Sequence, residues 1–583
     1  MAILTNRMQG VVQQMLNTMF RTGRSAIINT ARDVIACIVS ADDELLAIGT
    51  SLPIMTMAGP DIVTRYAREV HQAIRAGDAF LHNDPYHGNS HTADQSVLAP
   101  VVDAKGVLRF WVYVKAHVAD TGNSLPTTAM PSARDVYEEG ALIFPCVKVQ
   151  SGYEDVDDVL RMCRVRIRVP DMWMGDYRAM LGAVRTAERD LLKLGADVGW
   201  HAIEEYNREW LAYSEHRMIA AIQQLPAARH TAETYYDPQP FPGVEEGLRI
   251  RATVDVRPDE GKIIVDCRDN PNCVPCGVNL TEATTLAAVR FAVYNSLPAD
   301  VPVNGGAFRR IEILLREGSV CGIPVHPYSC SMATTSVANR LSGAVQLAFA
   351  EFGDGIGMAE AGGAYAAADS VISGCDPRNG QPFVNLPVVG ITGGPATPQS
   401  DGWIMYVAGA GGMMLRDSTE MDELLQPILI VEDRLLPDTE GSGRFRGALA
   451  NYVEYGPVNT EIELVCSAEA TVSPARGARN GGSAQVAHQY KRLTDGTLVT
   501  VKSPSVVRLK PGERIVSYSS GGGGYGPPWE RATDRVRHDV VEGYVTRKRA
   551  FEVYGVAIDE AGHVDQIATA RRRAELVATR QGM

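Results

Sequence analysis

Basic charge is scarce in this sequence. Lys and Arg together number 56 against 69 Asp and Glu, which gives a formal net charge of −13 at pH 7. Surfaces that bind nucleic acid are built from clustered Lys and Arg, and no basic run offsets the acidic balance here. The composition therefore argues against nucleic acid as a partner.

Long hydrophobic runs and cysteines are also few. No uninterrupted apolar stretch approaches the roughly 20 residues needed to span a bilayer, and the first residues lack the small-residue cleavage site of a secretory signal. Ten cysteines in 583 residues are too sparse for a disulfide scaffold. We expect a soluble, cytoplasmic protein with reduced thiols and no membrane association.

A complete nucleotide-binding loop is missing as well. The glycine run from Gly521 to Gly526 offers consecutive backbone amides that can cradle an anion. It lacks the Gly-Lys-Ser/Thr ending of a phosphate-binding loop and a following amphipathic helix. We interpret it as a flexible turn before a C-terminal element. No cofactor site for a nucleotide is predicted in this chain.

What the sequence contains is an ordinary globular composition in a chain too long for one core. Hydrophobic residues make up 45% and charged residues 21%, as in typical globular proteins, and 583 residues exceed what one core usually supports. We predict an α+β, multi-domain fold of mixed sheets and packed helices. Its expected parts are a hairpin region with a helical segment (1–235), a glycine-rich α+β region (236–530) and a helical tail (531–583).

Hydrophobic periodicity indicates the elements. It predicts helices over residues 9–22, 60–77, 154–225, 281–296 and 333–351. Strands are predicted over residues 25–39 (interrupted at Asp33), 143–145, 247–256, 262–267, 311–315, 428–435 and 461–466. The Gly- and Ala-rich stretch 353–415, which includes Gly409, Gly411 and Gly412, predicts close backbone approaches. Asp417, Glu420, Asp422 and Glu423 are expected on a solvated helix face.

The most informative stretch runs from Leu81 to Gly122. Two apolar runs, 97–102 and 108–114, flank a turn at 103–106, which is the pattern of a β-hairpin. A hairpin returns the chain, so the residues before its first strand and after its second strand lie on the same side. His91 and Asp94 are therefore expected close to His117 and Asp120.

Each end of this hairpin carries the pattern His-x-x-Asp. Imidazole nitrogen together with carboxylate oxygen suits Zn, Mn or Fe better than Ca or Mg. Two histidines with one or two carboxylates leave a coordination position open for water or substrate. The alternative is that these polar loop residues only cap turns.

Asp33 is a further candidate ligand. It stands between two apolar runs of a predicted strand, where an unpartnered carboxylate would be costly. A metal ion would satisfy it, and pairing with Arg24 or Arg32 is the alternative.

Motifs spread along nearly the whole chain carry a family resemblance. They are Asn83-Asp84-Pro85-Tyr86 through Asp94, His117 through Asn123, Tyr137-Glu138-Glu139-Gly140, residues 438–447, Gly521–Gly526, and residues 539–544 with 554–556. In these motifs and in their order, the sequence resembles the hydantoinase B/oxoprolinase family. That family includes the corresponding subunits of acetone and acetophenone carboxylases.

The resemblance implies one subunit of a larger enzyme. Family members work with a hydantoinase A-like ATPase subunit, which uses ATP to phosphorylate a carbonyl or amide oxygen, while the B-type subunit holds a divalent metal (Zn, Mn or Fe) and completes the reaction. Matched position by position, His91, Asp94, His117 and Asp120 resemble the family's metal site, and Asp33 its early acidic residue. Asp84 is expected to orient a ligand histidine.

Two departures from the family pattern concern the substrate. Asn89 and Asn123 each stand where the family usually has the second Gly of a Gly-Gly pair, so both amides are candidates for hydrogen bonds to substrate. With Asp84, they are the predicted catalytic residues. The predicted reaction is ATP-dependent hydrolysis of a cyclic amide such as a hydantoin, lactam or oxoproline. Ketone carboxylation is the first alternative, and a non-catalytic scaffold for the ATPase partner the second.

Overall fold

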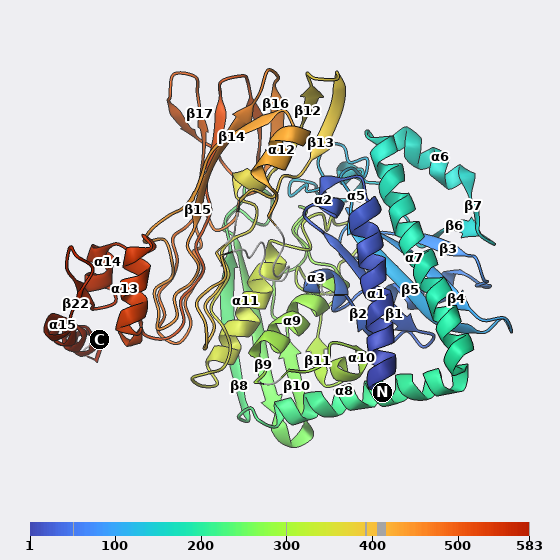
Figure 1. Cartoon of the computed structure of the whole chain (residues 1–583), viewed down its shortest axis with the longest axis horizontal. Helices are drawn as coiled ribbons and strands as arrows, with labels where there is room; N and C mark the ends of the chain where they lie inside the picture. Colours follow the sequence, from blue (N-terminus) through green and yellow to red (C-terminus); the bar gives the residue numbers. More distant parts are fainter. Residues whose placement is uncertain (50–51, 299, 391–392, 405–415, 582–583) are drawn as a thin grey trace.

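The computed structural model describes residues 1–49, 52–298, 300–390, 393–404 and 416–581 (Figure 1). Within these ranges lie a seven-stranded sheet, a five-stranded sheet, two four-stranded sheets and a small two-stranded one. Long helices cover the N-terminal sheet, and helices with a small two-stranded sheet form the C-terminal end. The architecture is mixed α+β.

The seven-stranded sheet is the frame of the N-terminal region. Its strand order is β2-β1-β5-β4-β3-β6-β7. The strands are β1 Val34–Ser40, β2 Leu45–Ile48, β3 Ala79–His82, β4 Asp94–Val102, β5 Leu108–His117, β6 Val147–Ser151 and β7 Glu154–Asp155. The central strands are apolar on both faces because both faces are covered. Val34, Ala36 and Ile38 pack toward helices on one side, and Ile35 and Cys37 face the second sheet's core on the other.

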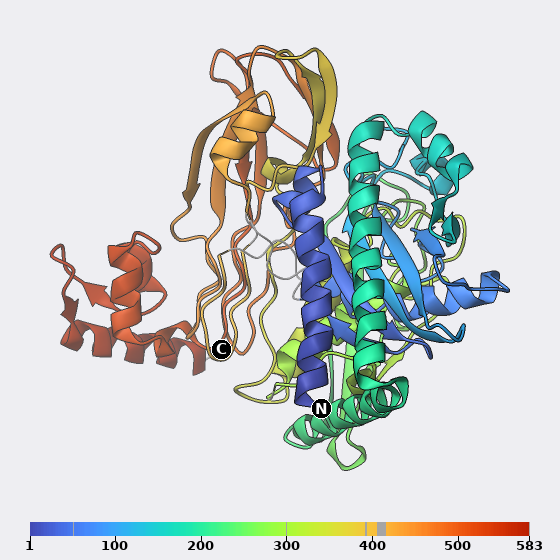
Figure 2. The same ribbon diagram turned by 45° about the vertical axis from the view of Figure 1, so that its right-hand side comes forward.

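Long helices cover the first face. Helix α1 (Ala2–Thr22) lies against α7 (Pro170–Val198), and both pack on the sheet (Figure 2). The remaining helices of this region are α2 Ala26–Asn29, α3 Pro53–Thr56, α4 Pro60–Val70, α5 Val136–Glu139, α6 Asp157–Arg166 and α8 Trp200–Ile222. The buried stripe Val12, Met15, Leu16 and Met19 of α1 is the face that its periodicity predicts.

The second sheet shares a hydrophobic core with the face of the first sheet that carries Ile35 and Cys37. It has the order β11-β10-β9-β8, with β8 Ala228–Tyr236, β9 Leu248–Arg257, β10 Lys262–Asp266 and β11 Ile311–Leu314. Helices α9 (Glu282–Ser296) and α11 (Val337–Ala350) fill the space between the sheets, and every residue of α11 is buried; α10 (Gly305–Phe308) caps one end. The division at residue 235 stays a prediction, and β8 runs through that position.

Two further sheets form the upper part of Figure 1. One has the order β13-β12-β16-β19 and the other β14-β15-β20-β17-β18. Their strands are β12 Val371–Asp376, β13 Gln381–Asn385, β14 Ile428–Leu435, β15 Asn451–Pro457, β16 Ile462–Cys466, β17 His488–Arg492, β18 Leu498–Thr500, β19 Ser505–Leu509 and β20 Arg514–Tyr518. Side chains such as Leu464, Val453 and Ile515 join both sheets in one core. Helix α12 (Thr419–Leu425) lies beside β14.

The C-terminal end has its own small core. It contains α13 Thr533–Val541, α14 Arg547–Glu552, β21 Ala557–Ile558, β22 Val564–Asp565 and α15 Gln566–Gln581. Val536, Ala550 and Tyr554 are buried in it. A buried ion-pair network attaches it to the rest: Arg531 contacts Asp401 (2.6 Å) and Asp539 (2.8 Å).

Glycine-rich segments connect the two upper sheets to this C-terminal end. Residues 393–394, 441–447, 477–482 and 521–524, here called the glycine bundle, run as extended traces side by side in both views. Backbone bonds join them, such as Gly441 N to Gly522 O (2.8 Å) and Gly524 N to Gly482 O (3.1 Å). A Cβ placed on Gly447 would lie 1.8 Å from Gly522 O. The interpretation of Gly521–Gly526 as a flexible turn is wrong, because this run is buried and packed.

Most predicted elements are present, with four further corrections. The helix predicted over residues 60–77 ends at Val70, because the backbone at His71 is extended. Residues 26–29 form helix α2, since the Asp176 carboxylate of α7 accepts the backbone N–H of Arg24 (2.6 Å) and of Ser25 (3.1 Å) at its start. Residues 143–145 are not a strand, because the Asn83 side chain bonds Phe144 N instead (2.6 Å). Asp417 and Asp422 are buried.

Two further points concern the glycine-rich stretch and the membrane. Gly409, Gly411 and Gly412 lie outside the described residues. Among the helices of the described ranges, none has the length and apolar character needed to cross a bilayer.

Candidate metal centre

The hairpin predicted between Leu81 and Gly122 is present. Strands β4 and β5 pair antiparallel with Asp94 opposite His117 at their open end. A turn before β4, closed by the bond from Asp94 N to His91 O (3.2 Å), adds His91 to the same end. The chain's return thus brings three of the predicted ligands together.

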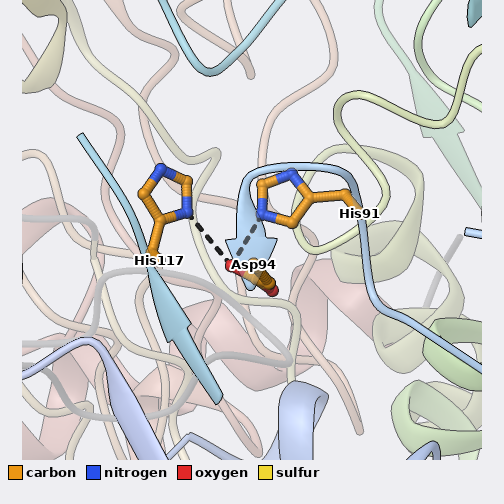
Figure 3. Close-up of side chains that lie close together, drawn as sticks. All are labelled: His91, Asp94 and His117. Carbon is orange, nitrogen blue, oxygen red and sulfur yellow. Dashed lines mark hydrogen bonds and ion pairs between the residues drawn. The ribbon is translucent and has the colours of Figure 1, made fainter. Parts of the chain in front are cut away.

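The three side chains converge on one point. His91 Nε2 lies 2.9 Å and His117 Nδ1 3.2 Å from the same oxygen, Asp94 Oδ1, and Figure 3 shows both rings turned toward this carboxylate. All three residues are buried, with exposed fractions of 3%, 5% and 1%. One ligand atom from each lies within 4.8 Å of the others, so a single ion can contact all three.

The hydrogen bond on the far side of His91 fixes its tautomer. Nδ1 lies 2.8 Å from the carbonyl oxygen of Ser331, which can only accept, so Nδ1 carries the proton. In the neutral ring the lone pair of Nε2 then points at the Asp94 carboxylate, and two electron-rich atoms face each other. Burial lowers the pKa of His91, but Asp94, the Ser331 carbonyl and Asp33 together outweigh this and raise the pKa overall. Either a second proton or a metal cation between them resolves the conflict.

His117 and Asp94 are held in the same way by outer partners. His117 Nε2 bonds Thr128 Oγ1 at 2.9 Å. The second oxygen of Asp94 accepts from the Ser90 hydroxyl, and buried Lys115 Nζ lies 3.3 Å from that hydroxyl. Metal-binding histidines commonly have such partners on their other ring nitrogen, which orient the ring.

Asp33 lies beside this cluster. Its Oδ1 is buried without a hydrogen-bond partner among the described residues. Burial raises its pKa to about 6, Asp94 adds to the rise, and His117 and His91 oppose it. A buried carboxylate oxygen without a partner is costly, and a cation shared with the cluster would satisfy it. Among the described residues, the ligand atoms within 4.8 Å of one another come from His91, Asp94 and His117. This set of two imidazoles and one carboxylate fits a divalent Zn, Mn or Fe ion.

Asp120 lies outside the cluster. Its carboxylate accepts from Gly122 N (2.9 Å) and pairs with Arg168 (3.1 Å). Asp84 is also engaged elsewhere, with His87 Nδ1 (2.8 Å) and Tyr86 N (2.9 Å). The structure thus brings neither carboxylate to His91 and His117.

The two predicted asparagines are both fully buried. Asn89 Nδ2 donates to the carbonyl oxygens of His91 and Asp94 (2.8 Å to the latter), so it shapes the ligand-bearing turn. Asn123 Oδ1 accepts from the Thr121 hydroxyl, while its Nδ2 has no partner among the described residues. Asn123 therefore keeps a free donor.

A narrow pocket opens at the cluster. The N-terminal region contributes one wall, and residues near β12, β13 and β16 contribute the other; the lining includes His91, His117, Thr128, Ser331, Thr335, Tyr365, Asp369, Val371, Leu386 and Ser467. Sequence reasoning missed Thr128, Ser331, Tyr365 and Asp369. The available signal was that Tyr365 and Asp369 are the only large or charged side chains between Gly362 and Ser370.

Fold and site define a class: a multi-domain α+β chain whose N-terminal hairpin presents a buried His–Asp–His cluster to a pocket closed by its C-terminal sheets. The chain belongs to the hydantoinase B/oxoprolinase family, whose model matches residues 1–528. The family inferred from the motifs is confirmed.

Individual relatives cover nearly the whole chain. Caprolactamase subunit beta of Pseudomonas jessenii is 28% identical over 584 residues, 98% of each chain. Acetophenone carboxylase delta subunit of Aromatoleum aromaticum is 23% identical over 612 residues, 97% of this chain and 87% of the relative. The crystal structure of ATP-dependent caprolactamase from P. jessenii has a TM-score of 0.84 at 25% identity, covering 98% of both chains. The predicted α+β multi-domain fold and the prediction of an enzyme subunit of hydrolase or carboxylase type are confirmed.

Proposed function

We propose that this chain is the metal-binding subunit of an ATP-dependent enzyme that hydrolyses a cyclic amide. It works with a hydantoinase A-like ATPase subunit in a cytoplasmic hetero-oligomer. The observation that carries the proposal is the buried cluster of His91, Asp94 and His117 at a pocket. End-to-end similarity to a caprolactamase subunit supports the substrate class.

The residues that would hold the metal are His91 through Nε2, His117 through Nδ1 and Asp94 through Oδ1, with Asp33 as the fourth ligand. A divalent ion bound there would polarise an acyl oxygen and lower the pKa of a coordinated water to about 7. Ser331, Thr128 and Ser90 fix the orientation of the ligands. We assign Asn123 Nδ2, the free donor, to the substrate. Asn89, Asp84 and Asp120 hold the surrounding loops.

The ATP-dependent step is assigned to the partner. In the glycine run that resembles a phosphate loop, the backbone amides of residues 522–524 already donate hydrogen bonds within the protein. Gly522 N bonds Ala448 O (3.0 Å), Gly523 N bonds Glu360 O (2.9 Å) and Gly524 N bonds Gly482 O (3.1 Å). These amides cannot cradle a phosphate without breaking the glycine bundle.

The first test is metal analysis of the purified chain beside the His91→Ala/His117→Ala double variant. We expect about one Zn, Mn or Fe per wild-type chain and none in the variant. His488→Ala, an exposed histidine on β17, is the matched control and keeps its metal. A double variant with full metal content would refute the site.

The second test uses the chain co-expressed with its ATPase subunit. Ring amides (ε-caprolactam, 2-pyrrolidinone, hydantoin and 5-oxoproline) are offered with ATP, in parallel with acetone and acetophenone plus bicarbonate. Hydrolysis of a ring amide supports the proposal. Carboxylation of a ketone would establish the first alternative, which the similarity to acetophenone carboxylase favours. Metal-free chains whose His91 and His117 are dispensable would indicate the scaffold.

A further inference from the structure

Tyr365 lines the pocket opposite the metal ligands. It precedes the short helix Ala367–Asp369 and strand β12, so it reaches the pocket from the C-terminal wall, whereas His91 and His117 come from the N-terminal hairpin. Its ring packs against a small cluster that includes Ala119, Val371 and Leu386. Two regions far apart in the sequence therefore meet across this pocket.

The backbone at Tyr365 is in a conformation that tyrosine rarely adopts. Its φ is +53°, in the left-handed region. The loop is held in place by the glycine bundle and by the residue before its last segment: Gly362 N bonds Gly393 O (2.8 Å) and Gly363 N bonds Ser520 Oγ (2.8 Å). Ser336, with φ of +44°, is strained in the same way next to Thr335 on the pocket wall. Strain of this kind persists where the surrounding structure enforces it, and such positions cluster at functional sites.

The Tyr365 hydroxyl is a neutral donor, because a phenol is protonated at neutral pH. Burial raises its pKa further above the ordinary value. Within the described ranges no hydrogen bond joins the Tyr365 hydroxyl to the protein. The pocket therefore contains a neutral O–H donor that is not committed to a protein acceptor.

We propose that Tyr365 contacts the substrate and donates its hydroxyl hydrogen bond to the reacting amide group, across the pocket from the His–Asp–His cluster. This assignment rests on the proposed function. In this assignment the phenol donates a hydrogen bond and transfers no proton, so its contribution is electrostatic. Because the donor is held in place before the reaction, it stabilises charge that develops in the transition state without reorganisation.

The test is Tyr365→Phe in the complex with the ATPase subunit, assayed on whichever of the four ring amides the wild type hydrolyses fastest. Phe keeps the ring, its packing and the backbone constraint, and removes only the hydroxyl. We expect kcat to fall by about 10²-fold or more with KM little changed, as for loss of an interaction made mainly in the transition state. Metal content per chain and Tm stay at wild-type values.

Tyr153→Phe is the matched control. Tyr153 also has a positive φ (+73°), is 54% exposed, and bonds Glu188 (3.1 Å) away from the pocket. We expect its kcat, KM and metal content to match the wild type.

The outcomes separate the two proposals. If the wild type hydrolyses a ring amide and Tyr365→Phe retains full kcat, only the Tyr365 assignment is overturned. A fall in bound metal or in Tm in Tyr365→Phe would show a structural role and also overturn it. If the wild type hydrolyses none of the ring amides, the proposed function fails and the assignment fails with it.

Discussion

The proposed metal centre and the glycine bundle are built on opposite principles. In the centre, three polar side chains converge in a buried space and are oriented by hydrogen bonds from Ser331, Thr128 and Ser90. In the bundle, the absence of side chains lets backbones approach so closely that a Cβ would overlap a carbonyl oxygen. The first region presents the side chains that we propose bind the metal, and the second holds the opposite pocket wall in place. The comparison predicts that mutations separate function from folding.

The largest effect is expected in the bundle. Gly447→Ala places a Cβ 1.8 Å from Gly522 O, which is backbone and cannot rotate away. We expect the free energy of unfolding to fall by more than about 4 kcal/mol, or the chain not to fold. Urea titration of the purified chain measures this. A variant within about 1 kcal/mol of wild type would show that the segments are not packed as described.

Mutations in the proposed metal centre are expected to lower the free energy of unfolding less and to abolish metal binding. Asp94→Asn keeps the shape but removes the charge that His91 and His117 share, so we expect metal affinity to fall by at least about 100-fold while the chain stays folded. Asp120→Asn is the informative comparison. Because Asp120 pairs with Arg168 outside the cluster, it should keep its metal and lose about 1–3 kcal/mol of stability. Metal loss in Asp120→Asn would return Asp120 to the ligand set.

The stability of the N-terminal sheet, which carries the proposed metal centre, should also depend on pH. His82 on β3 is fully buried, accepts a bond from Cys146 N (3.2 Å), and burial lowers its pKa to about 3. The unfolded chain binds a proton below about 6.5 and the folded chain does not, so stability is lost as pH falls from 6.5 toward 3. Between pH 7 and pH 5 this amounts to roughly 2 kcal/mol. Urea midpoints at pH 7, 6 and 5 should fall less steeply in His82→Gln, and equal slopes would contradict this.

The smallest effect tests the glycine argument itself. Gly182 lies within α7, and a Cβ there would meet no atom within 4 Å. Gly182→Ala should therefore raise stability by about 0.5–1 kcal/mol through helix propensity. Thermal unfolding beside Gly447→Ala shows whether position, rather than glycine content, decides the outcome. A destabilised Gly182→Ala would weaken the contrast between the two regions.

Sequence patterns predicted the secondary structure correctly where the contacts that form it are local. The apolar stripe of α1 and the β4–β5 hairpin follow from periodicity and a turn over a few residues, and both are present. Predictions failed where a distant residue decided the structure: Asp176 starts helix α2 near Arg24, and Val388 N binds the Asp417 carboxylate (2.9 Å) that had been expected in solvent. Neither partner is visible from the sequence around the element.

By itself the sequence determined the family and the meeting of His91, Asp94 and His117, because hairpin register is a short-range property. Only the tertiary structure decided which carboxylates join them. Asp120 is drawn away by Arg168, 48 residues further along, while Asp33 is left with a free buried oxygen beside the cluster. The second wall of the pocket, with Tyr365, likewise depends on how the C-terminal sheets dock. Docking is set by the packing of whole surfaces, which no local spacing of residues encodes.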